Sequence, residues 1–228
     1  MGNDVTQELS IRVGGLLLAA GAFAFIPIIF EYVFVIGAPT GTGADGSVTS
    51  ADSAAHALSH WQALSRGWRF EILAIASVAA AAMTLLGRHG NGRPGWALVV
   101  VGVLITCPMY ALMLGGYGTV LHGSDTDLEL YGALRASAIQ FFHSGIAVMR
   151  LGLALVFLAE VTTRCSKLWR AIFTLGFATN LLHGVFFIAL FWGASIPLAM
   201  ISPFGILGFV FAGILGLRLF KNSIPSQE

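Results

Sequence analysis

Six long apolar runs constrain the fold of this chain more than any other feature of its sequence. Each run has about the 20 apolar residues that an α-helix needs to cross the roughly 30 Å hydrocarbon core of a bilayer. The runs cover residues 11–36, 68–86, 96–121, 136–161, 168–192 and 196–220. They predict an all-α, polytopic membrane protein, a six-transmembrane-helix bundle that forms one integral-membrane domain over residues 1–228.

The composition excludes the main alternatives to a membrane protein. Charged residues make up only 10% of the 228 residues, whereas a soluble domain has roughly 25%. The formal net charge is +1 and no basic block is present, which excludes disorder and a nucleic-acid-binding surface. Cys107 and Cys165 are too few for a disulfide framework or a Cys-rich zinc site.

Positive charges at the ends of the runs predict the orientation in the membrane. Arg66, Arg69 and Arg135 flank the runs on one side. Eight cations flank them on the other side: Arg12, Arg88, Arg93, Arg164, Lys167, Arg170, Arg218 and Lys221. Because cytoplasmic loops are enriched in Lys and Arg, we expect both termini in the cytoplasm and residues 37–67 as the first outer loop.

The second half of this outer loop has the pattern of a short helix. Thr49 and Asp52 have the spacing of a capping box. The apolar residues that follow recur at helical spacing: Ala54, Leu58, Trp61 and Leu64. We therefore predict a short interfacial helix on the outer membrane surface. His56 and His60 lie four residues apart on it, a spacing that can hold zinc but is also typical of the polar face of such a helix.

One charge lies deep inside a predicted span. Arg150 is near the middle of run 136–161, where a charged side chain costs about 2.5–3.5 kcal/mol on insertion scales. His143 lies seven positions earlier, two helical turns away, so both side chains share a face. That face should line the bundle interior, with backbone carbonyls and Asn180 of the fifth run as partners for Arg150.

Four ionisable side chains are expected at one depth. They come from four different runs: Glu31, Glu71, His143 and His183. At a rise of 1.5 Å per residue, each of these residues lies roughly 5–10 Å from the middle of its run, towards the outer side of the membrane. Together they could bind zinc, iron or manganese. His143 and His183 could instead ligate a haem b, with Arg150 and Asn180 as further cofactor-binding candidates. The third run adds nearby polar or soft groups: Met109, Tyr110, Met113 and Tyr117.

The last run carries Gly208, Ala212 and Gly216 at strict four-residue spacing. Small residues placed in this way let another helix approach closely. Packing within the bundle, a homodimer contact and a docking face for another membrane protein all remain open.

Five short segments carry a further signal: Ser10–Leu18, Trp68–Phe70, Phe142–Ser144, Ser166–Arg170 and Leu175–Phe177. With the six spans, these segments resemble a widespread bacterial family of six-helix integral-membrane proteins of unknown function. The resemblance implies six spans and a bacterial cytoplasmic (inner) membrane, but no particular chemistry.

Three functions follow from these observations. The first is the binding of a small ligand, a lipid, a quinone or a metal in a polar cavity in the outer half of the bilayer. The second is a non-catalytic accessory subunit of a larger membrane complex, and the third is a b-type cytochrome. The sequence has no Gly-x-Ser-x-Gly elbow and no intramembrane Ser/His/Asp set, so it identifies no catalytic residues.

Overall fold

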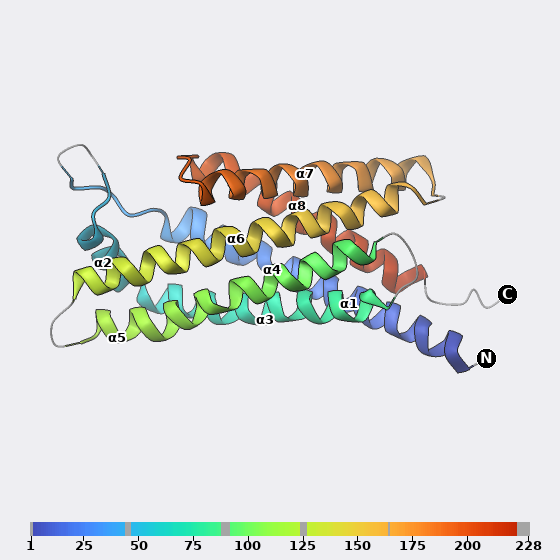
Figure 1. The fold of residues 1–228 in the computed structure, drawn as a ribbon, viewed down its shortest axis with the longest axis horizontal. Coiled ribbons are helices and arrows are strands. Elements are labelled where there is room, and N and C mark those ends of the chain that lie inside the picture. The colour runs from blue at the N-terminus through green and yellow to red at the C-terminus, as the bar shows by residue number, and fades with distance from the viewer. Residues whose placement is uncertain (1, 44–46, 88–91, 124–126, 164, 223–228) are drawn as a thin grey trace.

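The computed structural model describes residues 2–43, 47–87, 92–123, 127–163 and 165–222, and the regular secondary structure in this part of the chain is helical. The long helices lie side by side along the long axis of the molecule (Figure 1). In chain order the elements are α1 (Gly2–Phe30), η1 (Glu31–Ile36), α2 (Ser50–Ser59), α3 (Trp61–Leu86), α4 (Arg93–Ala111), η2 (Leu112–Tyr117), α5 (Gly118–Leu121), α6 (Leu128–Val161), α7 (Lys167–Phe191) and α8 (Leu198–Asn222). The segments η1 and η2 are π-helical and continue α1 and α4.

Six helical segments are long and apolar enough to cross a membrane, which confirms the predicted fold class. They are Thr6–Ile36, Trp61–Leu86, Arg93–Leu121, Leu128–Val161, Lys167–Phe191 and Met200–Lys221. The second and fourth begin seven or eight residues before the predicted starts at residues 68 and 136. Their first turns are polar, so hydropathy alone did not include them, although the helical backbone continues through these turns.

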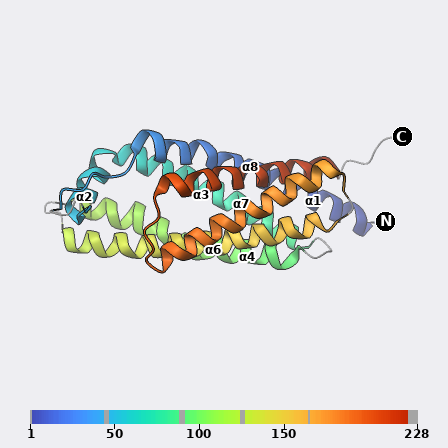
Figure 2. The same cartoon turned by 90° about the horizontal axis from the view of Figure 1, so that it is seen from above.

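The six spans form a closed ring. Each long helix packs against the next one in the chain, from α1 through α3, α4, α6 and α7 to α8, and α8 packs against α1. Both described ends of the chain therefore lie at one end of the bundle, and α2 lies at the other (Figures 1 and 2). The outward faces carry apolar side chains such as Leu73, Leu104 and Leu168, which are 64–68% exposed and suited to lipid.

Glycines allow the closest contacts between helices of the ring. A Cβ on Gly95 of α4 would lie 2.7 Å from the carbonyl oxygen of Gly152 on α6. A Cβ on Gly15 of α1 would lie 2.6 Å from the carbonyl oxygen of Gly216 on α8. Such close backbone approach replaces the missing hydrophobic driving force between helices in a membrane.

The stripe of small residues on α8 is used inside the ring. Gly216 packs on α1 at Gly15 and Ala19, while Gly208 packs on the side chains of Arg150 and Asn180. Ala212 between them is buried as well. Of the three uses that its spacing allowed, the structure shows packing within the bundle.

The predicted loop helix is present as α2. Its capping box is formed, because Thr49 Oγ1 accepts from the Asp52 backbone N–H while Asp52 accepts from the Thr49 backbone N–H at 2.9 Å. The predicted apolar pattern was wrong in one respect: α2 ends at Ser59, so Trp61 belongs to α3, and Leu58 is exposed. The buried face is instead small: Ser53, Ala54 and Ala57. This face packs on α6, where the Tyr131 hydroxyl donates to the Ser53 carbonyl oxygen at 3.2 Å.

Of the cations used to predict the orientation, Arg88 and Arg164 lie outside the described residues. The others lie as expected at the two ends of the bundle, on the helices that carry them. Arg66, Arg69 and Arg135 are at the end that carries α2.

Candidate functional site

A cavity of about 440 Å³ lies inside the ring, towards the end that carries α2. Its volume is within the roughly 300–1,000 Å³ that is typical of small-molecule sites. All six spans contribute to its wall, for example through Phe25, Trp68, Met109, Ile146, Phe187 and Phe209. The polar lining residues are Tyr32, His56, Glu71, Tyr117, Arg135, Arg150, His183 and Ser202. The cavity that was expected to be polar is thus mainly apolar, with polar groups at a few points.

Both π-helical segments line this cavity, and each begins four residues after a proline. Pro27 precedes η1 and Pro108 precedes η2. Proline interrupts the backbone hydrogen-bond ladder of a helix, and a π-helical turn accommodates such an interruption. Tyr32 of η1 and Tyr117 of η2 line the cavity from these widened turns. Single π-helical turns are frequent at functional sites.

Arg150 of α6 lines the cavity and is completely buried. Its Nη1 donates to Asn180 Oδ1 on α7 at 3.0 Å, the partner that the sequence predicts. Its Nη2 donates to the Gly205 carbonyl oxygen on α8 at 3.2 Å. Asn180 is held in turn, since its Nδ2 donates to the Gly176 carbonyl oxygen at 2.8 Å.

The face of an aromatic ring completes the surroundings of Arg150. The guanidinium carbon lies 3.7 Å from the ring centroid of Phe209, and this ring stacks on Phe25 of α1 at 4.3 Å. A cation over an aromatic face is stabilised by the ring quadrupole, more strongly where water is excluded. Within the described residues no carboxylate forms an ion pair with Arg150, so every group that holds its charge is neutral.

The two predicted histidines occupy different places around Phe187. His183 is buried, lines the cavity and packs edge-on against Phe187, with ring centroids 4.8 Å apart. His143 is half-buried and packs edge-on against the same ring at 5.6 Å, but it is not a lining residue. The Nδ1 atom of each imidazole has no hydrogen-bond partner among the described residues.

Glu71 of α3 is buried in the cavity wall beside two tyrosines. Tyr32 Oη donates to Glu71 Oε2 at 3.4 Å. The buried Tyr110 hydroxyl interacts with the same carboxyl electrostatically, but it makes no hydrogen bond of good geometry to any described residue. The cavity therefore has a second group of polar side chains, on η1 and α3, separate from the group on α6, α7 and α8.

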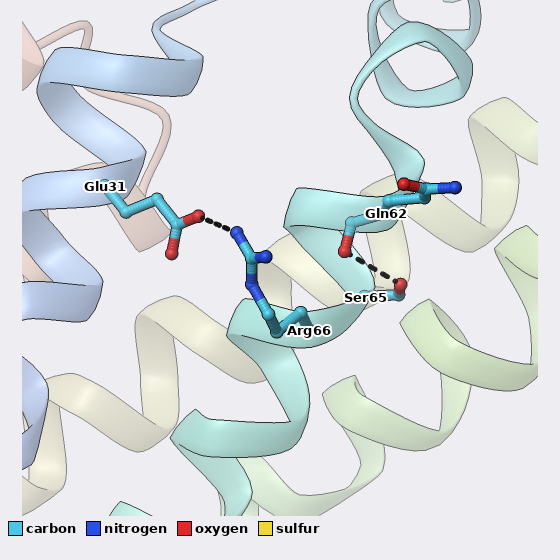
Figure 3. Close-up of polar contacts among 4 residues, drawn as sticks. All are labelled: Glu31, Gln62, Ser65 and Arg66. Atoms are coloured by element: carbon cyan, nitrogen blue, oxygen red, sulfur yellow. Dashed lines mark hydrogen bonds and ion pairs between the residues drawn. The ribbon is translucent and has the colours of Figure 1, made fainter.

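Glu31, the other predicted carboxylate, faces a cation at the bundle end. Its Oε1 accepts from Arg66 Nη2 at 2.7 Å, and the Arg66 side chain is 62% exposed (Figure 3). Directly before Arg66 in the chain, the Ser65 hydroxyl donates to the Gln62 carbonyl oxygen at 3.3 Å (Figure 3). Glu31 is not among the residues that line the cavity.

These positions give the predicted metal site no support. The four residues Glu31, Glu71, His143 and His183 do not gather into one set: across the described ranges, no group of three or more His, Cys, Asp or Glu could hold a metal ion. The haem hypothesis gains no support either, because His143 lies outside the cavity that His183 lines.

The first loop, α2 and α6 line the end of the cavity nearest to the end of the bundle, here termed its mouth. The lining residues there are Gly37, Pro39, His56 and Arg135. Partial burial, together with the neighbouring His60, lowers the pKa of His56, and its hydrogen bond to the Gly37 backbone partly offsets this shift. The two imidazoles lie 4.4 Å apart between ring centroids.

Sequence reasoning missed several residues of this site. It did not identify Tyr32, Phe25 or Phe209, because an aromatic residue in an apolar run carries no signal of its direction. Three of the soft or polar residues noted on the third run, Met109, Met113 and Tyr117, do line the cavity. The prolines at positions 27 and 108 were a signal that could have pointed to the two π-helical walls.

No family model matches the chain, and neither the curated proteins nor the solved structures contain a match to it. The resemblance to the six-helix family of unknown function is therefore not supported by these comparisons.

Proposed function

We propose that this multi-pass membrane protein binds a small lipophilic molecule in its central cavity. The observation that carries the proposal is an apolar cavity of about 440 Å³ to which all six spans contribute, with the buried cation Arg150 in its wall. An apolar pocket with a few convergent polar groups is the usual form of a small-molecule site. The lipid or quinone class fits this lining, and a hydrophilic substrate does not.

The orientation belongs to the same proposal. The bundle end with the described chain ends carries most of the flanking cations, so it faces the cytoplasm by the positive-inside rule. The mouth at His56 and Arg135 then opens towards the outer side, and the ligand enters from the outer leaflet or the outer interface.

A filled cavity tests the binding function. Ala138 of α6 is buried and lines the cavity, whereas Ala136 on the same helix is exposed. Native mass spectrometry of the purified protein with palmitate as the probe should give a saturable one-to-one adduct. Ala138→Phe should abolish the adduct and Ala136→Phe should retain it. An adduct that survives Ala138→Phe, or no adduct with the wild-type chain, would contradict binding in this cavity.

A further inference from the structure

We infer that the ligand carries one carboxylate, which binds Arg150, and a single apolar chain that extends along the cavity towards α2. This inference rests on the proposed function and adds the class and the direction of the ligand.

Within the described structure, no anionic group contacts Arg150. The side chain is fully buried, and its contacts are an amide oxygen, a carbonyl oxygen and an aromatic face. Burying a cation is costly, and neutral partners recover only part of that cost. An anion in the adjoining cavity would supply the missing charge, and a carboxylate matches the guanidinium geometry.

Two buried nitrogen atoms of residues in the cavity lining have no hydrogen-bond partner among the described residues. Arg150 has five N–H donors, and its Nε has no partner among the described residues. His183, also in the cavity wall, is buried with an unpartnered Nδ1 atom. Buried polar atoms in native proteins are normally hydrogen-bonded, so two such atoms in residues that line one cavity point to an absent polar group. A carboxylate can accept from both residues when His183 carries its proton on Nδ1.

The site matches a single negative charge. Arg150 is the permanent cation at this depth of the lining, because Arg135 is at the mouth. The wall also holds a carboxyl group, Glu71, and an ionised carboxyl there would repel a phosphate dianion about twice as strongly as a monoanion. A monocarboxylate therefore pairs with Arg150 at the smaller cost in repulsion.

The length of the cavity matches a chain. Arg135 and Arg150 both line it from α6, and their fifteen-residue separation corresponds to about 22 Å at 1.5 Å per residue. Between them α6 presents apolar lining residues: Ala138, Ile139, Phe142 and Ile146. An extended alkyl chain fills such a space with contacts along its whole length, so the ligand belongs to the class of long-chain fatty acids.

Two probes that differ only in the head group test the assignment. Palmitate carries a carboxylate, and hexadecan-1-ol has a chain of equal length with a neutral head. Because hydrogen bonds to charged groups contribute roughly 1.5–3 kcal/mol, the wild-type protein should bind palmitate at least about tenfold more tightly than hexadecan-1-ol. Arg150→Gln should remove this preference by weakening palmitate binding far more than hexadecan-1-ol binding.

Two further arginines serve as comparisons. Arg170 is exposed on α7 at the opposite end of the bundle, so Arg170→Gln should change neither affinity. If Arg135→Gln rather than Arg150→Gln removes the preference, the ligand lies with its head at the mouth and the assignment is wrong. Equal binding of both probes by the wild-type protein would also overturn it, even if Arg150→Gln fails to fold. In either case, loss of palmitate in Ala138→Phe would still uphold the proposed function.

Discussion

The guanidinium of Arg150 lies against the face of Phe209, 3.7 Å from the ring centroid, although the two residues are on different helices and 59 positions apart in the chain. The contact joins α6 to α8 inside the ring, and Phe209 continues it to Phe25 of α1 by stacking. One buried cation on α6 thus contacts α7 and α8 directly, and it reaches α1 through Phe209.

Removing the aromatic face should weaken the bundle. Phe209→Leu keeps an apolar side chain but loses the cation–π contact, so the free energy of unfolding should fall by about 2 kcal/mol. Titration of the purified protein with SDS in mixed micelles measures this change. Phe34→Leu is the matched control: Phe34 is 65% exposed, so it should change stability by less than about 0.5 kcal/mol. Equal effects of the two substitutions would show that the contact is not stabilising.

A single methyl group at Gly208 should displace Arg150. The added Cβ would lie 2.6 Å from Nη1 of Arg150 and 3.1 Å from Oδ1 of Asn180. Overpacking of this kind costs about 1–3 kcal/mol, so Gly208→Ala should unfold at a clearly lower SDS fraction. Gly115→Ala adds the same methyl group where nothing lies within 4 Å and should leave the transition almost unchanged. A wild-type transition for Gly208→Ala would mean that α8 can shift away without loss.

Acid should loosen the cap of α2. Hydrogen bonds from Thr42 and Thr49 hold the pKa of Asp52 well below its ordinary value. A carboxyl whose pKa is lower in the folded state stabilises the fold above its unfolded pKa, and this contribution is lost as the pH falls further. Hydrogen exchange of the α2 amides should therefore speed up relative to α6 as the pH falls below about 4. In Asp52→Asn the α2 amides should exchange faster at neutral pH, and their exchange should no longer speed up in acid relative to α6. If the acid-induced increase persists in this variant, another titrating group causes it.

Cysteine labelling should determine the orientation. In single-cysteine variants, Thr40→Cys in the first loop should react with a membrane-impermeant maleimide in intact cells. Cys165, between α6 and α7 at the other end of the bundle, should react only after the membrane is opened. The reverse order would place the cavity mouth in the cytoplasm and overturn the proposed direction of ligand entry.

The six spans could be predicted because their signal is local: a run of apolar residues has the length that a bilayer requires. The Arg150–Asn180 contact could be predicted because a buried cation restricts its partners to a few polar residues at similar depth. The four-residue metal site could not be judged from depth alone, since depth does not give the direction of a side chain around its helix. Glu31 shows this best. It begins the π-helical segment η1, where the turn widens, and it pairs with Arg66 at the end of the bundle.

The closure of the ring by α1 and α8 has a consequence for biosynthesis. In the ring, α1 packs against α3 and α8. Because spans enter the membrane in chain order, α8 is the fifth span to be inserted after α1. Until α8 arrives, Arg150 has Asn180 but lacks the Gly205 carbonyl and the ring of Phe209. The insertion of α8 therefore both closes the ring and shields its buried charge. A nascent chain without this helix would hold a buried arginine with only one of its three partners, a state that is costly in a membrane.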